Sequence, residues 1–210
     1  MSGPTSPPVH AATATTARAL RVEGAFEVSS SSYPDHRGVV VVPFLEPAFR
    51  AATGVTGFAA AQTLTTRSGR HVARGLHYSA HPDGMAKYVY CLGGRALDLV
   101  VDVRVGSPTF GCSDAVVLDD VTSHGVYVPP GVGHGVVALH DDTVVHYLLS
   151  TPYDAALERT VHLLDPDLAL PLTCDAPLRL SERDRTAPGL AAARAAGRLP
   201  AYLGGAVTHG

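Results

Sequence analysis

Short apolar segments, separated by turn-forming residues, follow one another along the chain from Leu20 onward. Their short length and partial alternation of apolar and polar positions indicate strands, because successive side chains of a strand point to opposite faces of a sheet. The expected strands are residues 25–28, 39–44, 58–66, 74–78, 87–92, 95–103, 115–118, 125–128, 135–139 and 144–149. Short strands at this spacing predict an all-β fold, either an antiparallel sandwich or a small barrel.

Two connections carry clear turn residues. Residues 35–38, Asp-His-Arg-Gly, have the composition of a tight turn between two strands. The pair Gly93-Gly94 separates two apolar runs, and glycine at both central positions permits the positive φ angles of a two-residue loop. We therefore expect a β-hairpin whose strands are residues 87–92 and 95–103.

The two ends of the chain differ from this pattern. Residues 1–18 are small, polar and proline-containing, which predicts a disordered arm. Residues 181–198 alone have a helical pattern, interrupted by Pro188 and Gly189. We expect one domain over residues 19–188 and a helical or loose tail over residues 189–210.

Composition limits the classes of function. A chain of 210 residues with 46% apolar residues can bury one good core. Its net charge of -3 gives no basic field for nucleic acid, so a small-molecule partner is expected. The sequence has neither an apolar run of about 18 residues nor the pattern of a signal peptide, and we expect a cytoplasmic protein. Cys91, Cys112 and Cys174 lack the spacing of a metal site and are expected to be free.

The chain contains a single lysine, Lys87, and a single glutamine, Gln62, and it lacks asparagine, isoleucine and tryptophan. A GC-rich genome gives such a bias and favours arginine wherever positive charge alone is needed. Retention of Lys87 therefore suggests a need for a compact ammonium group that a planar guanidinium does not meet.

The stretch Arg74-Gly75-Leu76-His77-Tyr78 holds the strongest candidate for chemistry. A strand at this position directs the His77 imidazole to one face of a sheet and its two neighbours to the other. Arg74 and Lys87 bracket the histidine with positive charge, which suits an anionic substrate and a negative charge that develops beside a base.

Several motifs occur in an order that resembles one family. They are RGLHY (74–78), Lys87, DLVVDVRVGSPTFG (98–111), VPPGVGHGVVAL (128–139), Tyr147, LLDPDLAL (163–170) and LSERDRTAP (180–188). Together they are similar to the nucleoside-diphosphate-4-keto-6-deoxyhexose 3,5-epimerases, the RmlC-like epimerases. The resemblance implies a cupin-type jelly roll without metal or cofactor, usually a homodimer that exchanges N-terminal strands. The implied substrate is dTDP-4-keto-6-deoxyglucose.

The resemblance also implies roles for four residues. His77 is the base, Asp184 its partner, and Tyr147 the acid on the opposite face of the sugar, while Lys87 donates to the C4 oxygen. Elementary chemistry agrees, because a proton next to a ketone leaves readily only when a positioned base removes it and the enolate oxygen is stabilised. A carboxylate beside the histidine holds its tautomer and stabilises the imidazolium.

Substrate-binding roles follow from the same resemblance. Arg74 and Arg37 correspond to positions that contact the diphosphate, where a forked guanidinium suits paired phosphate oxygens. Gln62 resembles a position that contacts the thymine edge, and His134 a second histidine near the reacting carbons.

The sequence departs from the family pattern at three places. Val42 stands where an acidic residue is common, Leu64 where asparagine is common, and Met85-Ala86 where Gln-Gly precedes the lysine. These changes bear on the nucleotide contacts and on which carbon is inverted. With the GC-rich composition, they favour an antibiotic deoxysugar pathway and inversion at C3, either alone or together with C5. Inversion at C5 alone is the alternative.

Two other classes of protein are alternatives to an epimerase. Residues 129–134 resemble half of a cupin metal signature, which would suit a metal-dependent oxygenase. His77, however, is followed by Tyr78 and Ser79 without a second histidine or a nearby glutamate, and two histidines are too few for a firm site. A non-catalytic sugar-nucleotide binding module ranks last, because candidates for both base and acid are present. Structural or surface roles are expected for His10, His36, His71, His81, His124, His140, His146, His162 and His209.

Overall fold

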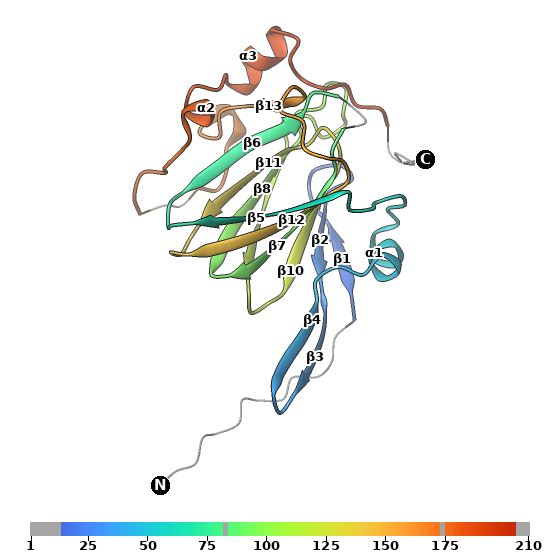
Figure 1. Ribbon diagram of the computed structural model, residues 1–210. Coiled ribbons are helices and arrows are strands. Elements are labelled where there is room, and N and C mark those ends of the chain that lie inside the picture. The colour runs from blue at the N-terminus through green and yellow to red at the C-terminus, as the bar shows by residue number, and fades with distance from the viewer. Residues whose placement is uncertain (1–13, 82–83, 173–174, 205–210) are drawn as a thin grey trace.

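Two antiparallel sheets lie face to face in the computed structural model, which describes residues 14–81, 84–172 and 175–204 (Figure 1). The six-stranded sheet has the spatial order β1 (Thr16–Ala19), β2 (Phe26–Ser29), β10 (His124–Val128), β7 (Lys87–Gly93), β12 (Thr143–Leu149) and β5 (Gln62–Ser68). The five-stranded sheet has the order β13 (Glu158–Thr160), β6 (Ala73–Ser79), β11 (Gly133–Ala138), β8 (Arg95–Val101) and β9 (Ser113–Asp119). The predicted all-β, antiparallel jelly-roll fold is confirmed.

The expected hairpin at Gly93-Gly94 is wrong. β7 lies in the six-stranded sheet, between β10 and β12, whereas β8 lies in the five-stranded sheet, between β11 and β9. The two glycines carry the chain from one sheet to the other, and only Gly94 has a positive φ, of 76°. Each strand buries side chains on both of its faces, and its backbone hydrogen bonds are made with the neighbouring strands of its own sheet.

Three apolar clusters hold the layers together. Between the sheets, Val89 and Val145 of the six-stranded sheet pack with Val100 and Val136 of the other. Leucines from β6 and β8 fill a second cluster, on the outer face of the five-stranded sheet, with residues of the C-terminal segment. Aromatic residues fill the third, where the helix α1 (Glu46–Thr53) covers the six-stranded sheet through Phe49. Because the five-stranded sheet is covered on both faces, its strand β11 is a continuous buried run without alternation.

A separate hairpin projects from the body of the molecule. It consists of β3 (Ser31–Asp35) and β4 (Gly38–Val42), and Figure 1 shows it extending away from both large sheets. The predicted turn at residues 35–38 is confirmed, and the Asp35 carboxylate accepts a hydrogen bond from the backbone N–H of Arg37 at 2.8 Å. Large apolar side chains of this hairpin, Tyr33, Val39 and Val40, are more than half exposed.

The C-terminal segment packs on the five-stranded sheet. It contains η1 (Pro166–Leu168), α2 (Glu182–Arg185) and α3 (Leu190–Ala195), and Figure 1 shows α2 and α3 beside β6 and β13. The predicted break in the helical pattern is confirmed, since α2 ends at Arg185 and Gly189 caps α3. Leu190 and Ala193 belong to the outer core cluster, so this part of the expected tail is integral to the domain.

The remaining expectations concern the termini and the cysteines. Residues 16–18, expected in the arm, belong to β1, and residues 1–13 lie outside the described part. Cys91 and Cys112 are free thiols, whereas Cys174 is outside the described residues. No helix in the described ranges is long and apolar enough to cross a membrane.

Candidate active site

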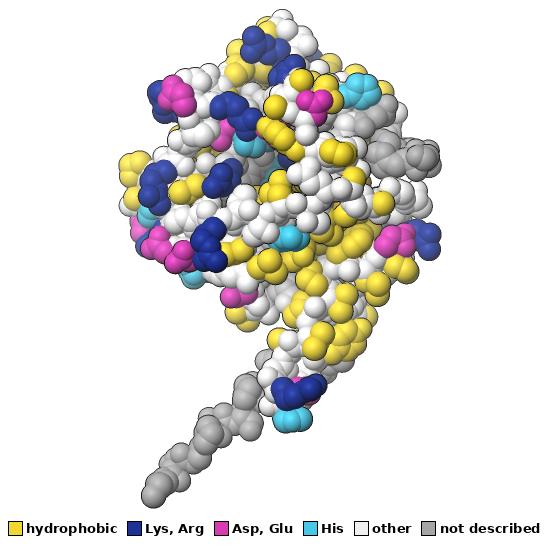
Figure 2. Space-filling model, viewed as in Figure 1, with side chains coloured by type: hydrophobic (Ala, Val, Ile, Leu, Met, Phe, Trp, Pro, Cys, Tyr) yellow, Lys and Arg dark blue, Asp and Glu magenta, His cyan; other side chains and the backbone are white. Residues whose placement is uncertain are grey.

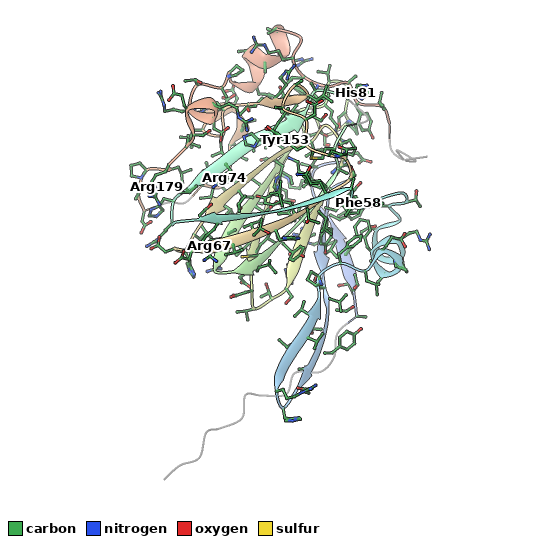
Figure 3. All side chains as sticks on the ribbon, in the orientation of Figure 1. Phe58, Arg67, Arg74, His81, Tyr153 and Arg179 are labelled. Carbon is green, nitrogen blue, oxygen red and sulfur yellow. The ribbon has the colours of Figure 1, made fainter. Side chains whose placement is uncertain are left out.

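A cavity of about 700 Å³ opens between the two sheets and the C-terminal segment. Figure 2 shows this face of the molecule hollowed, with Lys and Arg side chains around the hollow. Figure 3 shows Arg74, Tyr153 and Arg179, which line the same cavity. Six of the predicted site residues lie in its wall, namely Arg74, His77, Lys87, His134, Tyr147 and Asp184.

A bulge in β6 turns two of these residues toward the cavity. His77 is opposite His134 and Arg74 is opposite Val136, so two residues of β6 face the single residue between them on β11. Residues three positions apart in a regular strand point to opposite faces of the sheet. The extra residue in the bulge brings Arg74 and His77 to the same face. Gly75 is required here, because a Cβ on it would lie 2.5 Å from the carbonyl oxygen of His134.

His77 is paired with a buried carboxylate from α2. Its Nε2 lies 2.7 Å from Oδ1 of Asp184, whose other oxygen accepts a hydrogen bond from the backbone N–H of Gly75 at 3.3 Å. The Ser181 hydroxyl caps α2 by accepting from the Asp184 N–H, which fixes the turn that carries the carboxylate. Burial opposes ionisation, but the hydrogen bond and charge of His77 outweigh it and lower the pKa of Asp184.

Arg183, next to this carboxylate, also reaches the histidine. Its Nη2 lies 2.7 Å from Nε2 of His77, and its Nη1 donates to Glu158 at 2.6 Å. Glu158 begins β13 and pairs with Ser79 of β6, two positions along the strand from His77, whose own partner on β13 is Thr160. Both Arg183 and Glu158 line the cavity.

A second histidine–carboxylate pair lies deeper in the cavity wall. Nε2 of His134 is 2.8 Å from Oδ2 of Asp98, and both side chains are buried. Oδ1 of Asp98 is buried and has no hydrogen-bond partner among the described residues. Burial raises the pKa of Asp98, and the charges of His134 and Lys87 oppose that shift.

Tyr147 comes from the opposite wall. It lies on β12 of the six-stranded sheet, and its ring meets that of His134 edge-on at 6.0 Å between centroids. Burial raises the pKa of the Tyr147 phenol well above its usual range, and the nearby Asp98 adds to the effect. The phenol therefore keeps its proton across the ordinary pH range.

Lys87 lies between these groups. It begins β7 opposite Leu149 of β12, and its Nζ is 3.5 Å from the carbonyl oxygen of His77, to which it donates. Burial lowers the pKa of Lys87, against the charges of Glu158 and Asp98. The ammonium group is thus held at the wall of the cavity.

Two predicted binding residues lie elsewhere. Oε1 of Gln62 accepts a hydrogen bond from the backbone N–H of Tyr153 at 2.7 Å, so the glutamine holds the loop at the cavity edge. Arg37 is at the tip of the β3–β4 hairpin, paired with Asp35 at 2.6 Å and largely exposed. Figure 1 shows that hairpin remote from β6, so this chain does not bring Arg37 to its own cavity.

No group of three or more His, Cys, Asp or Glu side chains suited to a metal ion occurs in residues 14–81, 84–172 and 175–204. His77 and His134 are adjacent on the ladder, but Nε2 of each is directed at a carboxylate.

Sequence reasoning assigned no role to four residues of this site, which are Asp98, Tyr153, Glu158 and Arg183. Arg183 lies in the LSERDRTAP motif beside Asp184, so its proximity to the histidine was available as a signal. Glu158 belongs to a strand of three residues, which is too short for its pairing with β6 to be recognised from periodicity.

Fold and site together define a cupin-type jelly-roll enzyme equipped for acid–base chemistry. The family described as dTDP-4-dehydrorhamnose 3,5-epimerase matches residues 19–192. A dTDP-4-dehydrorhamnose 3-epimerase from Streptomyces niveus is 44% identical over 185 residues, 88% of each chain. A dTDP-4-dehydrorhamnose 3,5-epimerase from Mycolicibacterium smegmatis is 43% identical over 187 residues, 89% of this chain and 92% of the relative.

A solved structure agrees with these relatives. NovW, a 4-keto-6-deoxy sugar epimerase from the novobiocin biosynthetic gene cluster of Streptomyces spheroides, superposes with a TM-score of 0.85 at 42% identity. The match covers 96% of this chain and 98% of NovW. The chain therefore belongs to the dTDP-4-dehydrorhamnose 3,5-epimerase family and is an isomerase of the epimerase type.

Proposed function

We propose that the chain inverts C3 of dTDP-4-keto-6-deoxyglucose in deoxysugar biosynthesis. The observation that carries the proposal is that a histidine–carboxylate pair and a buried tyrosine come from opposite sheets and line one cavity. A sugar ring between them has a proton acceptor on one face and a proton donor on the other. Inversion next to a ketone requires that arrangement.

His77 takes the proton from C3 in this mechanism. Asp184 accepts a hydrogen bond from the imidazole, holds its orientation and stabilises the imidazolium that forms. Because the pKa of Asp184 is lowered, its carboxylate stays ionised under ordinary conditions. The electron pair of the broken C–H bond moves toward C4, and the ketone oxygen becomes an enolate.

Lys87 stabilises the enolate oxygen, and Tyr147 completes the inversion. An ammonium group inside a dry cavity stabilises developing negative charge strongly. Tyr147 then donates its phenolic proton to C3 from the other side, as the enolate returns to the ketone. Because the pKa of Tyr147 is raised, the phenol is protonated when the substrate binds.

Binding of the diphosphate is assigned to Arg74, and His134 contributes to the cavity wall near the reacting carbons. Arg74 lines the cavity, and its Nε donates to the Ser68 hydroxyl at 3.2 Å, which orients the guanidinium. Gln62 is assigned to the thymine, with one side of its amide committed to the loop backbone.

Arg37 reaches a diphosphate only in an assembly of two chains. We infer a homodimer in which N-terminal strands are exchanged and the hairpin of one copy covers the cavity of the other. The projecting β3–β4 hairpin with its exposed Tyr33, Val39 and Val40 supports this arrangement, because apolar side chains on an isolated hairpin favour association.

Deuterium exchange tests the reaction. The protein is incubated with dTDP-4-keto-6-deoxyglucose in deuterium oxide, and proton NMR follows the C3 and C5 signals. Loss of the C3 signal is expected. If the C5 signal is lost as well, the enzyme acts on C5 by the same chemistry. Retention of the C3 signal contradicts the proposal.

Complementation tests the shared site. Arg37→Ala leaves the cavity intact, and His77→Ala leaves the hairpin intact, so each variant alone is expected to be nearly inactive. If Arg37 acts on the partner copy, unfolding and refolding the two variants together restores activity in mixed dimers. Failure to restore activity, with mixed dimers shown to form, contradicts the arrangement.

A further inference from the structure

Two groups of opposite chemistry approach the same atom of the candidate base. Oδ1 of Asp184 and Nη2 of Arg183 both lie 2.7 Å from Nε2 of His77. The ionised carboxylate only accepts hydrogen bonds, and the guanidinium only donates them. In a neutral imidazole, Nε2 has either a proton or a lone pair, so it can satisfy one of these neighbours at a time.

Each partner selects a different tautomer. With the proton on Nε2, His77 donates to Asp184, and the lone pair that can accept a substrate proton is on Nδ1. With the proton on Nδ1, the lone pair is on Nε2, where it accepts a hydrogen bond from Arg183. Neither ring nitrogen is then free to accept a proton from the substrate. The partner that is hydrogen-bonded to Nε2 therefore decides whether His77 has a free lone pair with which to accept a proton.

The two partners are held differently. Asp184 is buried and fixed by the backbone of Gly75 and the cap of Ser181. The Arg183 side chain is 49% exposed. It is also held by Glu158, which accepts from the Tyr153 hydroxyl, and its Nε lies 3.5 Å from Oδ1 of Asp184. Arg183 can therefore leave Nε2 by rotation about its own side chain, whereas Asp184 stays in position.

We propose that Arg183 is a positioning residue for His77. It holds Nε2 in the free enzyme, with the ring proton on Nδ1, and releases Nε2 to Asp184 when an anionic substrate occupies the cavity. This inference rests on the proposed function, because a nucleoside diphosphate sugar supplies the negative charge that draws the guanidinium away.

The cavity makes such an exchange reasonable on electrostatic grounds. Arg183 and Glu158 both line it, so their ion pair lies where substrate enters. Phosphate oxygens bind guanidinium groups in the same forked manner as a carboxylate and bring more charge. A base released in this way becomes active only when substrate is present.

Nitrogen-15 NMR of the histidine side chains tests the proposal directly. Spectra are taken at alkaline pH, where imidazoles are neutral, on the free full-length protein and with saturating dTDP whose binding is verified by calorimetry. His77→Asn identifies the His77 signals. Protonated and unprotonated ring nitrogens differ widely in chemical shift, so the tautomer is read without any turnover.

The expected pattern separates Arg183 from its neighbours. The free protein shows the Nδ1–H tautomer at His77, and dTDP converts it to Nε2–H. Arg183→Met, which keeps the length of the side chain without its donors, shows Nε2–H with or without dTDP. Arg185→Met is the matched control, because Arg185 is on the same helix but pairs with Glu182, and it behaves as the unmodified protein. Glu158→Gln loosens the anchor and lowers the Nδ1–H share.

Two results overturn the proposal. One is an Nε2–H tautomer in the free protein, and the other is an Nδ1–H tautomer that bound dTDP leaves unchanged. Because the spectra require no reaction, their outcome is independent of deuterium exchange at C3. A failure of the proposed reaction is therefore distinguishable from a failure of the Arg183 assignment.

Discussion

His77 and His134 are direct partners across strands β6 and β11, and each lies against a different carboxylate. Their environments separate them. The pKa of Asp184, beside His77, is lowered, whereas burial raises the pKa of Asp98, beside His134. The first pair therefore keeps an ionised carboxylate that can stabilise an imidazolium, which supports the proposal that His77, and not His134, is the base.

Removal of the base is the first prediction. His77→Ala is expected to lower kcat by about 10²–10⁴-fold, the usual contribution of a positioned general base. Affinity for dTDP, measured by calorimetry, is expected to stay close to that of the unmodified protein, because the proposal assigns the imidazole to the sugar and not to the nucleotide. His124→Ala is the control, since His124 pairs with Glu27 away from the cavity. Normal turnover in the His77 variant would exclude it as the base.

Lys87→Arg tests whether positive charge alone suffices. The guanidinium is larger and planar and cannot place one donor on the C4 oxygen as an ammonium does. We expect kcat to fall by about 10²–10³-fold, the effect of losing one donor to a developing oxyanion. Steady-state kinetics measures it, and a rate near that of the unmodified protein would refute the argument from the single lysine.

The alkaline limb of the pH–rate profile should also belong to Lys87. Burial lowers the pKa of Lys87, so the required ammonium is lost as pH rises through a value below the usual lysine range. Burial raises the pKa of Tyr147, so that acid keeps its proton further up. The residual activity of Lys87→Arg should therefore extend to higher pH, because guanidinium does not deprotonate. Superimposable alkaline limbs would count against this assignment.

Asp102 is expected to dominate the stability of the loop after β8. Its buried carboxylate accepts from Arg104, Ser107 and Thr109. Asp102→Ala leaves a buried guanidinium unpaired and should lower the free energy of unfolding by about 3–5 kcal/mol in urea titrations. Asp35→Ala, which removes an exposed ion pair at the hairpin tip, is the control and should have no measurable effect.

The same residue gives a signed pH dependence. Burial raises the pKa of Asp102, but bonds from Arg104, Ser107 and Thr109 outweigh burial, and the net pKa is lowered. Its stabilisation is present above the pKa of an unfolded aspartate and is lost as pH falls through the lower folded value. Stability should therefore decline less steeply in that acid range for Asp102→Ala than for the unmodified protein. Parallel acid profiles would show that Asp102 is not the group responsible.

The sequence predicted most of the strands, though not β1, β3 or β13, and it predicted the hairpin turn at residues 35–38 and the gathering of His77, Tyr147 and Asp184 around one cavity. Local patterns predict these elements because periodicity and turn residues act over a few positions. Periodicity does not predict contacts between residues far apart in the sequence. The contact between His77 and Asp184, which are 107 positions apart, was predicted from the resemblance. The tautomer competition at Nε2 was not predictable, because it depends on ångström-level placement of Arg183.

Other features escaped prediction for a different reason. The Gly93-Gly94 connection has hairpin composition, yet the partners of β7 and β8 are chosen by burial across the whole sandwich. Arg74 and His77 are three positions apart and share the cavity only because β6 is bulged. Arg37 was grouped with the site by resemblance, and the hairpin that carries it projects away from the cavity of its own chain.

Tyr147→Phe provides the most direct test of chemistry on two faces. The variant is incubated with dTDP-4-keto-6-deoxyglucose in deuterium oxide, and one NMR series follows both loss of the C3 proton and appearance of the inverted sugar. If His77 and Tyr147 act from opposite faces, C3 exchange continues while inversion falls by at least about 10²-fold. Equal loss of exchange and inversion, or normal inversion, would contradict the account.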